Sequence, residues 1–504
     1  MQKKLLAVAV LSAFSGVAAA QSANVTLYGT IVQHVETVSA TGGDSSPVVT
    51  GSSARTGVGG GRVAAAGLGV AGVADQSGRF RFNPAGTNFG LRGSEDLGNG
   101  LSAWFQIEQA VQIGNSPPNA GTNHGTAASY RNTAVGLRSN TWGTVLFGMW
   151  DTPFNVMVST LNVNSRVGGA STGHHANMLG SSMLGQGAVS GQSTAAWCTA
   201  VANGGGSTAS NCMNFGTNFD RRERSSMQWW SPNWNGFEVR GAYNVTADSG
   251  GITALNQAGN RNALKQNIWD LSLSYTNGPL VVGYAYERQN DTMAAAARTF
   301  ISAAGGTIAG GEANLAGTQT GAWTMGTAAA AGAAGATYMS GSTGVGHRLG
   351  AKYAIGGFGF GAMWESLKWD MSYNTDPIAA GAAPSVNVLT GLKKTAWRLA
   401  GNYTWGSHFV GLDYVRTNAL TGSIGISGAA AAVPAAFDGS GTSSRAWQAH
   451  YNYALSKRTA IGAYYNVVRN DTNANYSGLV FGGITGPAAG SSPKYLGMQV
   501  RHSF

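Results

Sequence analysis

The sequence has few charged residues and, after its N-terminus, no long hydrophobic run. Only 10% of its 504 residues are charged, whereas a soluble domain averages about a quarter. Water is therefore not the only medium that contacts its surface. No later stretch approaches the ~20 consecutive apolar residues of a membrane-spanning helix, and the mean hydropathy is −0.06. These absences exclude a helical membrane protein and leave a closed β-barrel as the way to cross a membrane.

The N-terminus carries the features of an export signal. Lys3 and Lys4 precede an apolar core over residues 5–17, and three alanines follow at 18–20. This order is typical of a cleaved signal peptide. An anchor helix that is not cleaved is the alternative, but the core is too short to span a bilayer. We expect residues 1–20 to be removed and residues 21–504 to form one domain.

Cysteine is almost absent. Cys198 and Cys212 are the only two cysteines, and we expect them to form a disulfide because an exported protein meets an oxidising compartment. Two free thiols in a loop are the alternative. No other Cys or His lies at zinc-ligand spacing from them, and no Ser, His and acid stand in a catalytic arrangement. We therefore expect no metal, no cofactor and no enzymatic activity.

What the sequence does contain is a series of segments in which apolar and polar residues alternate. In the last of them, Leu496, Met498, Val500 and Phe504 fall on one face, whereas Gly497, Gln499, Arg501 and Ser503 fall on the other. The same period recurs over residues 25–35, 103–113, 237–245, 269–275 and 447–455. Alternation with a period of two is typical of β-strands with one apolar and one polar face. Pairing of the first strand with the last would close a barrel.

Short and long connections alternate along the chain. The short ones are rich in Gly, Asn, Pro or Ser and lie at 95–100, 139–143, 232–236, 276–279, 355–357, 404–407 and 455–458. The long ones lie at about 38–79, 114–128, 151–220, 247–265, 292–345, 371–392, 420–442 and 472–493. Transmembrane barrels have short periplasmic turns and longer outer loops. The count predicts an all-β fold, a 16-stranded antiparallel transmembrane β-barrel, and barrels of this size enclose a water-filled lumen.

Several of these segments resemble the outer-membrane general diffusion porins of β-proteobacteria, the Burkholderia, Bordetella and Neisseria type. They are the opening Val-Thr-Leu-Tyr-Gly at 25–29, the segments 88–100 and 450–470, and the ending 497–504. The resemblance implies a homotrimer in the outer membrane of a Gram-negative bacterium, in contact with lipid and lipopolysaccharide. It also implies that the terminal aromatic residue, Phe504, is read by the outer-membrane assembly machinery.

The same resemblance implies a constriction made by an in-folded third loop. Gly148-Met-Trp-Asp-Thr-Pro153 resembles the start of that loop, which places Asp151 on it, and no other carboxylate follows before Asp220. On the barrel wall, Arg131 and Arg222 match family arginines. Arg224 shares the face of Arg222 by alternation. Asn88 stands where the family has an arginine, and we expect Arg92, on the same face, to substitute partly for that arginine. These arginines could instead be structural and pair with Glu223 or with carbonyl groups.

The charge balance bears on selectivity. Without Lys3 and Lys4 the chain has 29 basic and 21 acidic residues, a net charge of +8. Basic residues in a pore favour anions. We expect a porin for passive diffusion of small hydrophilic solutes and ions, anion-preferring, with no nucleic-acid partner. The alternatives are a substrate-specific channel, a structural or adhesin barrel, and basic residues that contact lipopolysaccharide phosphates outside the pore.

Overall fold

The structure is a computed structural model. It describes residues 24–42, 76–83, 86–111, 129–164, 178–180, 219–245, 267–290, 337–375, 386–424, 441–472, 474, 476 and 490–504. Within these residues the chain forms one antiparallel sheet of 19 strand segments. The segments are β1 (Asn24–Thr41), β2 (Gln76–Asn83), β3 (Asn88–Gly98), β4 (Leu101–Ala110), β5 (Ser129–Tyr130), β6 (Thr133–Ser139), β7 (Gly143–Asp151), β8 (Arg222–Trp230), β9 (Phe237–Val245), β10 (Asn267–Asn277), β11 (Leu280–Asn290), β12 (Thr337–Ile355), β13 (Phe358–Thr375), β14 (Val386–Trp405), β15 (His408–Thr417), β16 (Thr421–Ile424), β17 (Ser444–Ala454), β18 (Thr459–Asn470) and β19 (Ser492–Ser503). A helix, α2 (Pro153–Leu161), follows β7.

The 19 segments make 16 barrel strands, because three strands are each interrupted once. β2 and β3 both pair with β1, with Asn83 opposite His34 and Asn88 opposite Thr30. In the same way β5 and β6 both pair with β4, and β15 and β16 both pair with β14. The predicted strand count is therefore confirmed.

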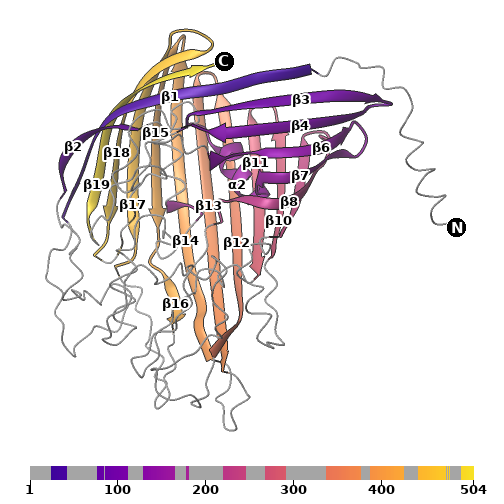
Figure 1. The fold of residues 1–504 in the computed structure, drawn as a ribbon. Helices are drawn as coiled ribbons and strands as arrows, with labels where there is room; N and C mark the ends of the chain where they lie inside the picture. The colour runs from indigo at the N-terminus through magenta and orange to yellow at the C-terminus, as the bar shows by residue number, and fades with distance from the viewer. Residues whose placement is uncertain are drawn as a thin grey trace, which may run out of the picture.

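The barrel closes between the first and the last strand, as the sequence predicts. β1 pairs with β19 so that Val35 lies opposite Met498. At the end of this ladder, the backbone N–H groups of Gly29 and Phe504 each donate to the carbonyl of the other, at 3.1 and 3.0 Å. Gly29 has no side chain there, and a Cβ atom would overlap the ring of Phe504. Figure 1 shows the C-terminus beside β1, and the strands β3 to β8 crossing β12 to β14 as opposite walls of a barrel with tilted strands.

All seven short connections are confirmed and lie at one end of the barrel, which we call the short-turn end. We call the opposite end the long-loop end. The predicted loop limits 292–345 and 371–392 are wrong, because β12 begins at Thr337, β13 ends at Thr375 and β14 begins at Val386. The limits 38–79 and 420–442 are wrong as well, because the first overlaps the end of β1 and the start of β2, and the second contains β16. The β12 and β13 ladder continues to a pair between Thr337 and Thr375. Its outer part is rich in Gly, Ser, Thr and Asn, so backbone pairing continues there without an apolar alternation to reveal it.

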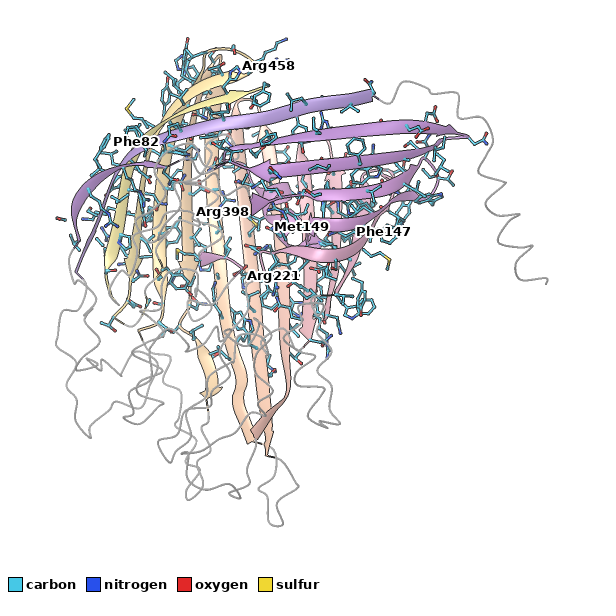
Figure 2. All side chains as sticks on the ribbon, in the orientation of Figure 1. Phe82, Phe147, Met149, Arg221, Arg398 and Arg458 are labelled. Carbon is cyan, nitrogen blue, oxygen red and sulfur yellow. The ribbon has the colours of Figure 1, made fainter. Side chains whose placement is uncertain are left out.

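The two faces of the sheet are inverted relative to a soluble protein. Outward residues such as Leu271 and Leu496 are 48% and 61% exposed, whereas the inward residues Glu365 and Gln499 are 0% and 2% exposed. A soluble protein keeps Leu inside and Glu outside. Figure 2 shows large hydrophobic side chains such as Phe147 on the outside of the barrel. The barrel therefore fits an apolar surrounding and a polar interior.

Aromatic side chains gather on the outer face at the short-turn end. Phe358 contacts Tyr403 with ring centroids 4.4 Å apart, and Tyr403 stacks on Trp405 at 5.4 Å. Phe237 and Tyr275 form another such pair at 4.4 Å. Transmembrane barrels carry aromatic girdles at the membrane interfaces, so these rings mark one interface.

The helix α2 lies inside the barrel, so the third loop is folded inward as expected. The hydroxyl of Thr152 caps it by accepting a hydrogen bond from the Asn155 N–H at 3.2 Å, and Pro153 begins the first turn. The helix lies against β9 to β13. Gly283 lies beside Met157, where a Cβ atom would overlap the methionine sulfur. Among the described residues, no helix has the length and apolar character that crossing a membrane requires.

Candidate functional site

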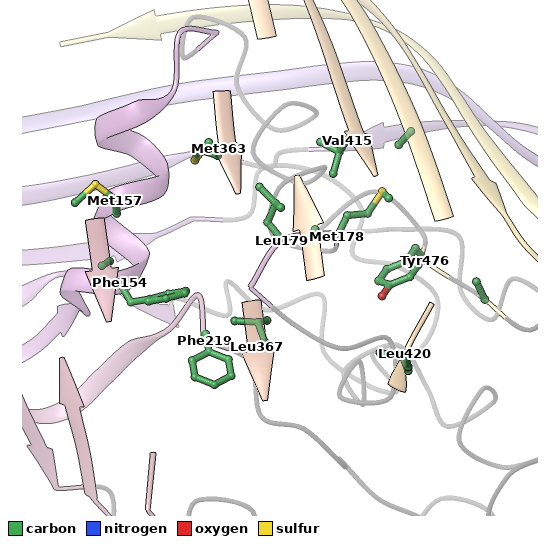
Figure 3. Packing of buried hydrophobic residues seen from close by; sticks show 14 of the residues in the cluster. Phe154, Met157, Met178, Leu179, Phe219, Met363, Leu367, Val415, Leu420 and Tyr476 are labelled. Carbon is green, nitrogen blue, oxygen red and sulfur yellow. The ribbon is translucent and has the colours of Figure 1, made fainter. Parts of the chain in front are cut away.

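The third loop covers one wall of the lumen with an apolar cluster. Phe154, Met157 and Leu161 of α2 are buried, together with Met178, Leu179 and Phe219 from later in the loop. They pack on inward side chains of β11 to β18, among them Ala285, Met363, Leu367, Trp369, Ala396 and Val415 (Figure 3). Within the described residues, the inner face of β1 to β8 contributes no side chain to this cluster and carries a smaller one of its own, Trp104, Ala134 and Leu146.

Arg348 on β12 holds both ends of the loop. One guanidinium nitrogen, Nη1, donates to the Phe154 carbonyl at 2.9 Å and to Asp220 Oδ1 at 2.7 Å, and Nη2 donates to Glu365 Oε2 at 2.8 Å. Glu365 also accepts the Gly180 N–H at 2.9 and 3.0 Å. The Arg348 side chain is fully buried. A buried charge is stable only when it is paired and hydrogen-bonded, and here the loop supplies part of that pairing.

A second buried ion pair holds the segment after α2. Arg398 on β14 pairs with Asp413 on β15, and its Nη2 donates to Asn162 Oδ1 at 2.8 Å. Asn164 donates to the other oxygen of Asp413 at 2.7 Å. Both charged side chains are 1% exposed. The loop is thus tied to β14 and β15 as well as to β12.

Two carboxyl groups lie beneath α2. Asp270 and Glu287 are directly opposite each other on β10 and β11 and are 5% and 0% exposed. Thr152 donates to Glu287 at 3.3 Å, and Asn244 donates to Asp270 at 3.1 Å. Like Glu365 and Asp413, these acids are covered by the loop and do not contribute exposed negative charge to the lumen.

The structure brings the predicted residues Arg222 and Asp151 together. Their side chains form an ion pair of 2.9 Å, and each is 22% exposed. Asn132 bridges them: its Oδ1 accepts from Arg222 Nε at 2.7 Å, and its Nδ2 donates to Asp151 at 2.9 Å. This partly exposed pair lies where the third loop leaves the wall.

Arg131 is also paired. Its guanidinium forms an ion pair with Glu108 on β4, whose second oxygen accepts the Tyr28 hydroxyl hydrogen at 2.9 Å. The side chains of Arg131 and Glu108 are 28% and 12% exposed. Arg131 and Arg222 thus pair with Glu108 and Asp151, and not with Glu223, the carboxylate that the sequence suggested.

Arg92 differs from the other predicted arginines. It is exposed, its guanidinium carbon lies 5.1 Å from the centre of the Tyr28 ring, and within the described residues no carboxylate forms an ion pair with it. Asn88 donates to the Gly86 carbonyl at 3.0 Å, at the interruption between β2 and β3. The Arg224 side chain lies outside the described residues, as do Cys198, Cys212 and residues 1–20.

Sequence reasoning missed several residues that complete this wall. Tyr28, Glu108 and Asn132 bind the predicted arginines, and Arg138 lies over the Trp104 ring at 5.6 Å. Alternation places Glu108 and Arg138 on the inward face, but only the register shows which partner each one meets. In the described ranges, no group of three His, Cys, Asp or Glu side chains could hold a metal ion.

Comparison with known proteins agrees with this architecture. The sequence matches the Gram-negative porin family over residues 7–346 and 302–473. It is 26% identical over 301 residues to an outer membrane porin protein of Bordetella pertussis, covering 58% of this chain and 60% of that protein. It is 32% identical over 177 residues to the major outer membrane protein P.IB of Neisseria gonorrhoeae, covering 34% and 38%. The matches thus span 60% or less of the length of these relatives.

Among solved structures, the fold is similar to an anion-selective porin from Comamonas acidovorans. The TM-score is 0.52 with 17% sequence identity, over 96% of this chain and 100% of that one. This likeness shows the porin fold. Together with the family match over most of the sequence, it shows that the chain belongs to the family of Gram-negative porins of the outer membrane.

Proposed function

We propose that this chain forms a water-filled channel for passive diffusion of small hydrophilic solutes and ions, with a preference for anions. Sixteen strands enclose more space than side chains fill, and the described part of the third loop packs against strands from β9 to β18. We further propose that the narrow part of the lumen is lined by Arg92, Arg131, Arg222, Arg224 and Asn88 on the wall and by Asp151 on the loop.

The observation that supports the anion preference is that two inward arginines are exposed and have no ion-pair partner among the described residues, whereas several inward acids are covered. Arg92 and Arg138 are exposed on the inner face of β3 and β6. By contrast, Glu365 and Asp413 are covered by the third loop. Charged groups lining a pore attract counter-ions only where water and ions reach them. The similar porin from Comamonas acidovorans is described as anion-selective, but the proposal rests on the charges of this chain.

The test is the reversal potential of the purified protein in a planar bilayer under a salt gradient. We expect an anion-selective potential that shifts toward zero in the double variant Arg92→Gln/Arg138→Gln. The matched control is Lys457→Gln/Arg458→Gln, which removes two exposed positive charges from a turn at the short-turn end. A cation-selective wild-type potential would overturn the charge argument. The absence of conductance and of sugar-dependent liposome swelling would favour a structural or adhesin barrel.

A substrate-specific channel is a second candidate, because the structure gathers three tryptophans on the inner wall. Trp150 lies 5.7 Å from Trp104 and 5.5 Å from Trp230, and Arg240 lies 4.9 Å above the Trp230 ring. Aromatic faces next to an arginine suit a planar anionic solute. If this patch selects solutes, benzoate will enter proteoliposomes faster than acetate, and Trp150→Leu will abolish the difference. Equal rates in the wild type would exclude this candidate.

We also propose a homotrimer, assembled by the outer-membrane machinery and surrounded by lipid and lipopolysaccharide. Native gel mobility before and after boiling tests the trimer. A mobility that does not change with heating, at the position of a monomer, would contradict it.

A further inference from the structure

Four polar side chains on the inner face of β17 to β19 are buried without complete hydrogen bonding. They are Gln448 and His450 on β17, Asn466 on β18 and Gln499 on β19, and we call them the polar patch. Each is at most 5% exposed. Both polar atoms of Gln448, His450 and Asn466, and Oε1 of Gln499, have no hydrogen-bond partner among the described residues. Buried polar groups in native proteins are almost always hydrogen-bonded, so this patch is suited to bind a polar ligand.

The strand registers bring the polar patch together. Gln448 is directly opposite Asn466, and His450 is the next inward residue along β17. Gln499 joins them from β19, because its Nε2 donates to Oδ1 of Asn452, the inward residue after His450, at 3.2 Å. Residues opposed in an antiparallel ladder have Cα atoms about 4.5–5.5 Å apart. The four side chains therefore form one contiguous surface on the wall.

The polar patch adjoins the apolar cluster under the third loop but does not hold the loop. Ala446 and Val468, the inward pair next to it on the side of the long-loop end, belong to that cluster. On the neighbouring strand β15, Asp413 binds Asn164 of the loop segment. By contrast, no described loop residue forms a hydrogen bond with the atoms of the patch named above. Anchoring of the loop therefore does not account for these polar groups.

The polar patch offers uncharged amides next to a neutralised ion pair. Asp413, directly opposite Gln448, pairs with Arg398, and both charged side chains are buried. Arg501 is the next inward residue after Gln499 and lies beyond the patch, toward the short-turn end. The groups that lack partners are thus carboxamides and an imidazole. They can form hydrogen bonds with a ligand but carry no fixed charge that would attract an ion.

We propose that the polar patch binds an uncharged polyhydroxylated solute, of the sugar class, in the lumen. A carboxamide has two N–H donors and an oxygen acceptor, and a sugar hydroxyl group both donates and accepts. Hydroxyl groups would thus satisfy the oxygens of Gln448, Asn466 and Gln499 as well as the amide nitrogens. An ionised carboxylate offers acceptors alone and leaves the three oxygens without donors. The inference rests on the proposed channel, because a solute reaches the inner wall through the lumen.

The experiment measures glucose binding to the purified protein in detergent by saturation-transfer NMR. The test variant is Gln448→Leu/Asn466→Leu. The matched control is Gln33→Leu/Gln109→Leu, which removes two amides that alternation places on the outer face. We expect saturable glucose binding, with a Kd that rises at least tenfold in the test variant and stays unchanged in the control. Glucuronate, which has a carboxylate in place of the CH2OH group, should displace glucose only at concentrations at least tenfold above the Kd of glucose.

Thermal unfolding separates binding from folding. Leu has nearly the volume of the two amides, and replacing polar groups that lack partners with apolar groups of similar shape is nearly neutral for stability. The midpoint temperature of unfolding of the test variant should therefore not fall. A lower midpoint with unchanged glucose binding would assign the amides to stability and overturn the proposal. If the double variant does not fold, Asn466→Leu alone replaces it, with Gln33→Leu as its control.

The remaining outcomes distinguish this inference from the proposed channel. Unchanged glucose binding in the folded test variant would overturn the inference, and so would displacement of glucose by glucuronate at the Kd of glucose. A wild-type signal that does not saturate would show that water, and not a sugar, satisfies the patch. The NMR measurement does not require conductance. A protein that conducts but does not bind glucose would contradict this inference alone, whereas a protein that binds glucose but does not conduct would contradict the channel.

Discussion

Arg348 and Asp220 are 128 residues apart in sequence and form an ion pair of 2.7 Å inside the barrel. The pair joins the end of the third loop to β12. Since the same guanidinium also binds the Phe154 carbonyl and Glu365, one side chain fixes two separate parts of the loop against the wall. The position of these parts of the loop therefore depends on a buried charge that is far from them in sequence.

Replacing Arg348 by Met should release the third loop. Asp220 and Glu365 would lose a buried partner, and breaking a buried ion pair in this way costs about 3–5 kcal/mol. We expect a larger and noisier single-channel conductance and a lower temperature for the heat-dependent mobility change. The control is Arg288→Met on the outer face, which should alter neither property. Wild-type conductance and wild-type heat resistance in Arg348→Met would disprove the role of this residue.

Replacing Asp151 by Asn should strengthen the anion preference. Arg222 would lose its carboxylate partner at 2.9 Å while its own charge persists, so the net positive charge of the constriction rises. The reversal potential should move closer to the equilibrium potential of chloride. Glu95→Gln, in an exposed position next to a short turn, removes the same charge and should have a smaller effect. A shift toward cations in Asp151→Asn would contradict the prediction.

Replacing Tyr464 by Phe should weaken the closure of the barrel. The Tyr464 hydroxyl donates to Glu36 at 2.6 Å, which links β18 to β1 across β19, and Arg81 pairs with the same carboxylate at 2.7 Å. Removing one donor from a buried carboxylate costs about 1–3 kcal/mol. The midpoint temperature of thermal unfolding of the refolded protein should fall. Tyr465→Phe, whose ring is 44% exposed on the outer face, provides the comparison and should leave the transition unchanged.

Replacing Phe504 by Ala should reduce the amount of folded protein in the outer membrane. The backbone hydrogen bonds between Gly29 and Phe504 do not need the ring, so refolding of the purified variant in detergent should proceed as in the wild type. We therefore expect the variant to assemble poorly in cells. Membrane fractionation and heat-dependent gel mobility measure the amount of folded protein in the outer membrane. His502→Ala serves as the control. Equal amounts of the Phe504 variant and the wild type in the outer membrane would refute the assembly role.

Much of the site could not be predicted from the sequence. The resemblance to the porin family placed Arg131 and Arg222 on the barrel wall, but their partners, Glu108 and Asp151, follow from the register of neighbouring strands. The pairing of Arg398 with Asp413 and Asn162 requires the loop to cross the lumen, and no local pattern encodes such a contact. Likewise, the adjacency of Gln448, Asn466 and Gln499 results from the registers of β17, β18 and β19, which bring together residues up to 51 positions apart.

The sequence by itself determined the strands, their two faces, the alternation of short and long connections and the closure between residues 25–35 and 495–504. These features are local, since a period of two and a tight turn can each be read from a few consecutive residues. Only the tertiary structure decided which charges are covered and which remain exposed. That outcome depends on where the third loop packs, and the loop is positioned by buried ion pairs and apolar contacts between residues far apart in the chain.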